Sequence, residues 1–189
     1  LSYEILNDEI FTLLSVLLLS GIYFYNFTTP EFNVNVSQLP FWALCVYFFW
    51  KGINTNKKIN WVLFGTFSAL GVLSKYLFIY LLVALFTYFI FNYKNLKKFL
   101  TNYLLSLVIF FILLIPHFIW LIENDFITVF YGLNRSGLNA FHISNHLINP
   151  IIFLFKQIMI LIPIFIMLIS ITKKFKFKIN LKNKKTQFL

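Results

Sequence analysis

Six apolar runs, separated by short polar stretches, follow one another along the chain. Runs of this kind predict helices in a membrane, although the first four are shorter than the ~20 residues that cross a ~30 Å hydrocarbon core. Short spans need tilt, a locally thinner bilayer or cover from neighbouring helices, and each could alternatively be a re-entrant half-helix. The pattern predicts an all-α polytopic membrane protein of about six short hydrophobic helices. They cover about Ile10–Asn26, Val36–Trp50, Trp61–Ser74, Tyr76–Phe91, Leu100–Ile122 and Leu147–Ile171.

The stretch from Trp61 to Phe91 decides the predicted topology. As one helix it would be about 46 Å long at 1.5 Å per residue and would cross the membrane once. The lysines before and after it would then lie on opposite sides. A break near Ser74 and Lys75 instead returns the chain to its starting side, and we therefore predict two helices.

Basic residues then gather on one side of the membrane. Residues 51–60, 92–99 and 172–189 hold 13 of the 16 lysines and arginines. Because cytoplasmic loops carry an excess of Lys and Arg, we assign this side to the cytoplasm. The predicted organisation is a membrane domain at 1–171 and a basic cytoplasmic tail or loop at 172–189. The outward side receives Thr28–Asn35, the turn at Lys75 and the loop Glu123–His146.

Composition supports lipid as the solvent. Hydrophobic residues make up 60% of the chain and charged residues 12%, against roughly 45–50% and 25% in soluble domains. The net charge of +10 does not indicate nucleic acid as a partner, because the basic residues lie between apolar runs. Cys45 is the single cysteine, so no intrachain disulfide forms. A start without Met, close to a hydrophobic span, indicates a piece of a longer protein.

Lys75 is the first candidate for chemistry, since no Walker loop, dinucleotide fingerprint, nucleophile elbow or zinc-spaced Cys/His set occurs. It interrupts 31 otherwise apolar or neutral residues and would lie at the outward end of two helices. Its ammonium suits a lipid-linked phosphate or pyrophosphate. The alternative is a lysine that snorkels to the headgroups and ends a span.

Acidic and mixed polar positions give further candidates. Glu31 follows Pro30 in a turn and could accept sugar hydroxyls, bind a metal or act as a base, or simply begin a helix. Arg135, the single arginine, could hold phosphate or carboxylate, or anchor the chain at the interface. His142 and His146 have the i, i+4 spacing of a metal pair, but no third ligand is identifiable. No cofactor or metal ligand is assigned, and a divalent metal stays open.

Four strings, in order, resemble the family 39 glycosyltransferases of the GT-C type, which include dolichyl-phosphate-mannose protein mannosyltransferases and bacterial aminoarabinose transferases. They are FTTPEF at 27–32, GVLSKY at 71–76, PHFIW at 116–120 and NDFITVF at 124–130. The resemblance covers about residues 28–136. It adds Tyr76, His117 and Asn124 to Glu31, Lys75 and Arg135 as substrate-binding candidates.

The resemblance implies an enzyme that transfers a hexose or pentose from a polyprenyl phosphate to a lipid, glycan or protein acceptor. This would occur on the outward face of a multi-pass protein, in the bacterial inner membrane. Glu31 stands where the family usually has Asp. The family's principal acidic pair is expected before Leu1, so the catalytic residues are not identified and this piece alone is predicted to be inactive. Asp8 and Glu9, expected on the cytoplasmic side, are not given that role.

Two other classes of function stay open at this point. A multi-span transporter or lipid flippase would also use short helices and ionisable groups, although no inverted repeat is visible. A noncatalytic membrane scaffold would leave Glu31 and Lys75 without a shared role.

Overall fold

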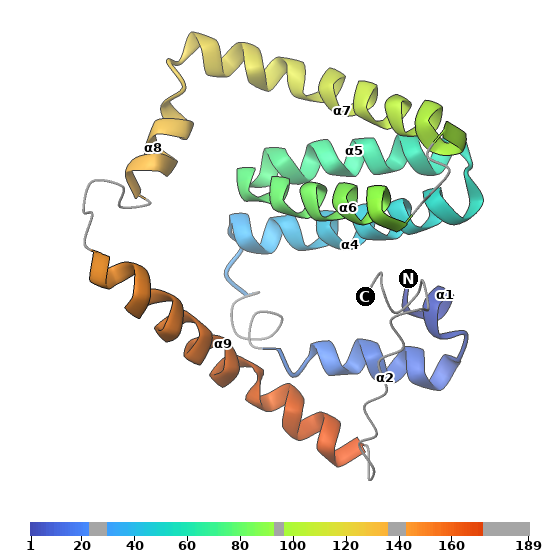
Figure 1. Ribbon diagram of the computed structural model, residues 1–189, viewed down its shortest axis with the longest axis vertical. Helices are drawn as coiled ribbons and strands as arrows, with labels where there is room; N and C mark the ends of the chain where they lie inside the picture. The colour runs from blue at the N-terminus through green and yellow to red at the C-terminus, as the bar shows by residue number, and fades with distance from the viewer. Residues whose placement is uncertain (23–29, 93–96, 136–142, 172–189) are drawn as a thin grey trace. The chain divides into compact units, whose positions relative to one another are not determined.

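The computed structural model describes residues 1–22, 30–92, 97–135 and 143–171. Within these residues every regular element is helical and no strand occurs, which confirms the predicted all-α class. The predicted tail at 172–189 lies outside the described residues. The elements in Figure 1 are α1 (Ser2–Leu6), α2 (Glu9–Leu19), α4 (Val34–Thr55), α5 (Lys58–Ser74), η1 (Tyr76–Phe78), α6 (Ile79–Asn92), α7 (Lys97–Glu123), α8 (Ile127–Arg135) and α9 (Ile143–Ile171).

The chain divides into two compact units, each described by itself. One combines Leu1–Glu31 with Val129–Leu189, and the other is the continuous stretch Phe32–Thr128. In the first unit, α2 contacts α9. The carboxylate of Asp8 accepts a hydrogen bond from the backbone N–H of Phe11 (2.9 Å) at the start of α2. Asp8 is therefore a helix cap.

The continuous unit is built around α5, which packs along both α4 and α7 (Figure 1). Gly65 permits the close approach to α7, because a Cβ there would overlap the backbone carbonyl of Ser106. Small residues serve this purpose between membrane helices. The rings of Phe49, Trp61 and Phe89 meet edge to face, with centroids 6.1 to 6.3 Å apart. They join α4, α5 and α6 in a buried core.

The predicted break between Trp61 and Phe91 is confirmed. Helix α5 ends at Ser74, Lys75 has extended backbone angles (φ −162°, ψ 127°), and the chain continues through η1 into α6. Gly71 allows η1 to lie against the end of α5, because a Cβ there would overlap the ring of Phe78. Lys75 is thus held at a junction between two helices.

Helix α4 is longer than the apolar run that predicted it. The run covers Val36–Trp50, whereas the helix has 22 residues, about 33 Å at 1.5 Å per residue. The side chain of Asn33 accepts hydrogen bonds from two backbone N–H groups of the first turn (2.9 and 3.2 Å). Asn56 ends the helix in the left-handed conformation (φ 52°). Polar caps extend the helix beyond its apolar residues, so the apolar run underestimated the length of the helix.

Helix α8 lies within the stretch Glu123–His146 that the sequence predicted as a loop. Asp125 and Phe126, with positive φ of 48° and 54°, turn the chain from α7 into α8. Polar residues favoured the loop prediction, but the apolar residues of 127–133 recur at helical spacing. The short helix α1 was not predicted either.

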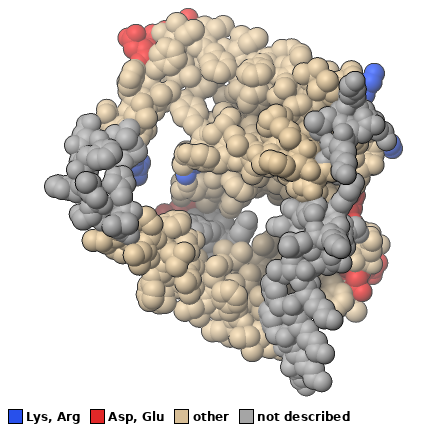
Figure 2. Space-filling model, viewed as in Figure 1, with Lys and Arg blue, Asp and Glu red and all other residues tan. Residues whose placement is uncertain are grey.

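The helices and their surface suit a membrane. Two described segments are long and apolar enough to cross one by length and composition, Phe99–Glu123 and Ile148–Ser170. Two shorter apolar helices are Glu9–Leu19 and Tyr76–Asn92. Large apolar side chains cover much of their exposed surface. On the face shown in Figure 2, charged side chains are few.

Candidate functional site

The ammonium group of Lys75 is held between α5 and α4. Its Nζ donates a hydrogen bond to the side-chain oxygen of Asn35, at 2.6 Å. Lys75 is half-buried, and among the described residues it has no carboxylate partner. An ammonium has three N–H donors, and the neutral amide of Asn35 accepts from one. The cation therefore keeps donors for an anionic ligand.

Tyr76, the next residue, connects η1 to α7 and α8. Its hydroxyl lies 2.8 Å from Nε2 of His117 and 2.7 Å from the hydroxyl of Thr128. The ring of His117 stacks on Trp120, with centroids 5.9 Å apart. A phenol can donate one hydrogen bond and accept another, so Tyr76 joins His117 and Thr128 in a continuous chain of hydrogen bonds. Two of the predicted site residues, Tyr76 and His117, are thus brought into direct contact.

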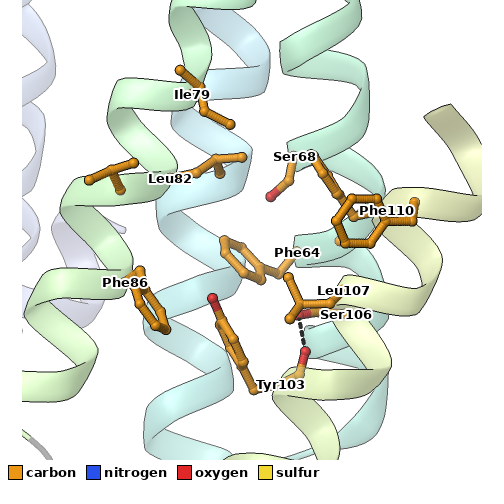
Figure 3. A pocket seen from close by; sticks show the side chains of 12 residues that line it. Phe64, Ser68, Ile79, Leu82, Phe86, Tyr103, Ser106, Leu107 and Phe110 are labelled. Atoms are coloured by element: carbon orange, nitrogen blue, oxygen red, sulfur yellow. Dashed lines mark hydrogen bonds between the residues drawn. The ribbon is translucent and has the colours of Figure 1, made fainter. Parts of the chain in front are cut away.

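An apolar cavity of about 260 Å³ lies between α5, α6 and α7 (Figure 3). Ile79 lines one end, and Phe86 and Tyr103 stack at the other with centroids 5.9 Å apart. The cavity is larger than the roughly 150 Å³ that accommodates benzene in an engineered apolar site. A segment of a hydrocarbon chain would fit. The other lining residues are Phe64, Gly65, Ser68, Leu82, Val83, Ser106, Leu107, Phe110 and Phe111.

The cavity begins close to the polar residues. Ile79 follows Tyr76 by about one helical turn, and Phe110 precedes His117 by about two turns. The contact between Tyr76 and His117 joins η1 to α7, and the cavity is lined by α6, which follows η1, and by an earlier part of α7. The residues that line the cavity therefore begin one to two turns away from the pair Tyr76 and His117.

Of the other three predicted residues, one lies at the end of α7 and two belong to the other unit. The amide of Asn124 donates to the backbone carbonyl of Trp120 (2.8 Å), which makes it a local partner at the end of α7. Glu31 and Arg135 are exposed and belong to the other unit. The predicted proximity of Glu31 to Lys75 stays a prediction.

No group of three or more His, Cys, Asp or Glu side chains that could hold a metal occurs among the residues that were described. Of the predicted histidine pair, His142 and the side chain of His146 lie outside that part of the chain.

Sequence reasoning missed Asn35, Gln38 and Thr128. Asn35 and Thr128 pair with residues 40 and 52 positions away, and no local pattern signals such partners. Gln38 lies one turn after Asn35 on α4, and its side-chain oxygen is buried. A glutamine beside an apolar run carries no signal of its own, so only the folded chain reveals it.

The fold and this site define an α-helical membrane protein with a cation and a hydrogen-bonded polar cluster at a helix junction, next to an apolar cavity. The chain belongs to the dolichyl-phosphate-mannose-protein mannosyltransferase family, whose model matches residues 3–120. The match confirms the predicted family and favours a glycosyltransferase over a transporter. It covers Lys75, Tyr76 and His117 but ends before Asn124. No curated protein and no solved structure matches the chain.

Proposed function

We propose that the chain belongs to an enzyme that transfers a sugar from a polyprenyl-phosphate donor to an acceptor on the outward face of a bacterial plasma membrane. Two observations carry this proposal: the ammonium of Lys75, held by the neutral amide of Asn35, and the apolar cavity lined by Ile79 one turn after Tyr76. A polyprenyl-phosphate sugar has an anionic head joined to a hydrocarbon chain. The chain offers a cation for the anionic head and an apolar cavity for the hydrocarbon chain.

Lys75 is the proposed phosphate ligand. Phosphate oxygens accept charge-assisted hydrogen bonds, which are about twice as strong as neutral ones. Asn35 is neutral, and no described carboxylate pairs with Lys75, so a phosphate would supply the opposite charge. The first isoprenoid units of the same lipid would lie in the cavity between α5, α6 and α7, which is lined by Ile79, about one turn after Tyr76.

The proposed reaction moves the sugar with inversion at its anomeric carbon. An acceptor hydroxyl oxygen attacks this carbon, the bond from carbon to phosphate oxygen breaks, and polyprenyl phosphate leaves with the electron pair. Lys75 stabilises the charge that develops on the phosphate. The proton of the acceptor hydroxyl passes to a carboxylate.

Binding of dolichyl phosphate, the lipid of the matched family's description, tests this proposal without requiring turnover. The purified chain in detergent micelles would be titrated with radiolabelled dolichyl phosphate. We expect Lys75→Met to weaken binding about tenfold to hundredfold, since hydrogen bonds to charged groups contribute roughly 1.5–3 kcal/mol. Lys75→Arg should retain part of the affinity, because it keeps a cation.

Lys58→Met is the matched control. Lys58 is an exposed lysine at the first residue of the same helix, α5. It should bind dolichyl phosphate as the parent does. Circular dichroism and thermal unfolding of each variant separate loss of a ligand contact from loss of the fold. Parental affinity in a folded Lys75→Met variant would overturn the proposal.

A further inference from the structure

Gln38 lies on the face of α4 that meets the Lys75 junction. Residues 35, 38 and 42 follow one another at the spacing of one helix face. Asn35 accepts the hydrogen bond from Lys75 (2.6 Å), and Trp42 meets the ring of Phe78 edge to face, with centroids 6.0 Å apart. Gln38 is therefore placed between two contacts that join α4 to residues 75–78.

The side-chain oxygen of Gln38 is buried and accepts no hydrogen bond from any residue that the structure describes. A buried acceptor without a partner destabilises the folded chain. Most polar groups in such positions have a partner in the protein, in water or in a ligand. At a junction where the ammonium of Lys75 keeps donors beyond its bond to Asn35, the partner is expected to be a ligand of the same site.

The chemistry of this oxygen narrows the kind of ligand group. A carbonyl oxygen accepts hydrogen bonds, so its partner must carry a donor. A phosphate that is bound as an anion by Lys75 has acceptors only. The partner of Gln38 is therefore a different group of the same ligand, and a sugar hydroxyl next to the phosphate has the required donor.

We propose that Gln38 accepts a hydrogen bond from a hydroxyl of the sugar in the lipid-linked donor, while Lys75 binds its phosphate. This inference rests on the proposed function and assigns the sugar contact within the same site. It makes Gln38 a specificity-determining residue. The substrate, which carries the sugar, gains the contact, whereas the product polyprenyl phosphate does not.

Two lipids distinguish the two contacts. Dolichyl phosphate mannose and dolichyl phosphate would each be titrated into the purified chain and its variants in micelles. Gln38→Met keeps the length of the side chain but removes the acceptor. We expect it to weaken binding of dolichyl phosphate mannose about threefold to tenfold, the effect of one neutral hydrogen bond. Binding of dolichyl phosphate should be unchanged.

Gln157→Met, the same substitution in α9, is the matched control and should bind both lipids as the parent does. If Gln38→Met weakens the binding of both lipids equally, the inference is overturned and Gln38 has a packing role. Unchanged binding of both would also overturn it. Lys75→Met should weaken both lipids. If Lys75→Met changes the binding of neither lipid, the proposed function fails. If Lys75→Met weakens binding but Gln38→Met has no effect, only the inference about Gln38 fails.

A second measurement changes the lipid, so that its first arm uses only the parent chain. Dolichyl phosphates carrying singly deoxygenated mannoses would be titrated into the parent chain. One of them should bind about threefold to tenfold more weakly than the mannose lipid, and Gln38→Met should show no further loss with that lipid. Equal binding of all the deoxy lipids by the parent would contradict the inference.

Discussion

The continuous unit has polar side chains at both of its ends, and the two ends use them differently. At the turn between α4 and α5, the amide of Asn102 donates to both the backbone oxygen and the side-chain oxygen of Asn56, each at 3.0 Å. The indole N–H of Trp61 donates to the same side-chain oxygen (3.3 Å), and Asn60 donates to Thr55 (2.8 Å). These groups satisfy one another within the protein.

At the junction between α5 and η1, the polar groups are incompletely satisfied. Lys75 has a neutral partner and no described carboxylate, and the oxygen of Gln38 is buried without a partner among the described residues. The chain of hydrogen bonds through Tyr76 is partly exposed. The same kinds of side chain thus stabilise a turn at one end and stay available for a ligand at the other.

The difference indicates which polar groups of a membrane protein are candidates for ligand binding. A fully connected polar network makes a fold rigid, whereas a half-satisfied network destabilises it unless something else binds there. The number of polar residues does not separate the two ends. What distinguishes them is the number of polar groups without a full set of partners among the described residues.

The largest expected difference is that the two ends of this unit lie on opposite sides of the membrane. Contacts from α7 place Asn56 near its start and Tyr76 near its end, so the two junctions lie at opposite ends of this unit. The bias of basic residues predicts that the Asn56 end is cytoplasmic. In a Cys45→Ala background, Glu123→Cys should react with an impermeant maleimide in intact cells, and Lys58→Cys should not.

Both positions are exposed, charged ends of helices, so they are matched in reactivity. Lys58→Cys should react fully once the cells are permeabilised, which shows that its thiol is accessible. Labelling of Lys58→Cys alone in intact cells would reverse the assignment and place the Lys75 junction on the cytoplasmic side.

The next effect concerns stability at the Asn56 end. Asn102→Leu removes the donor to both oxygens of Asn56, a residue with left-handed backbone angles at the end of α4. We expect the free energy of unfolding to fall by about 1–3 kcal/mol. Thermal unfolding in detergent measures this change. Binding of dolichyl phosphate should stay at the parental level below the unfolding transition, because the contact lies at the other end.

Asn124→Leu is the control on the same helix. Its amide also donates to a backbone oxygen, but at an exposed position where water can replace it. It should lower the unfolding temperature less than Asn102→Leu does. Equal decreases in the unfolding temperature would show that the contacts of Asn56 stabilise the fold no more than the exposed hydrogen bond of Asn124.

The sequence predicted the fold where a signal was local. Lys75 interrupts a long apolar stretch, and that interruption located the break between α5 and α6. The caps of α4 were invisible to hydropathy because Asn33 and Asn56 extend the helix through hydrogen bonds and backbone angles. Helix α8 was missed because polar residues around Asn124 favoured a loop. In each case the wrong boundary lies where polar atoms determine the structure.

The site was predictable only as separate residues. Lys75 was chosen from its charge, and Tyr76 and His117 from a family resemblance. Their partners lie far away in sequence: 40 residues separate Lys75 from Asn35, and 41 separate Tyr76 from His117. Such pairs depend on how whole helices pack, which no short pattern encodes. Gln38 became a candidate only because its oxygen is buried in the folded chain.

The smallest expected effect sharpens the comparison at the Lys75 end. Tyr76→Phe removes the hydroxyl that lies 2.8 Å from His117 and 2.7 Å from Thr128. Water can replace these bonds at partly exposed positions, so thermal stability should change little, unlike at the Asn56 end. The start of α8 should open more readily, and amide hydrogen exchange in a peptide of 124–131 should accelerate about twofold to tenfold. Tyr131→Phe, which removes a hydroxyl from an exposed tyrosine of α8, should leave it unchanged. Equal exchange in both variants would show that Tyr76 does not hold α8, and a large loss of thermal stability would make its hydroxyl as structural as the amide of Asn102.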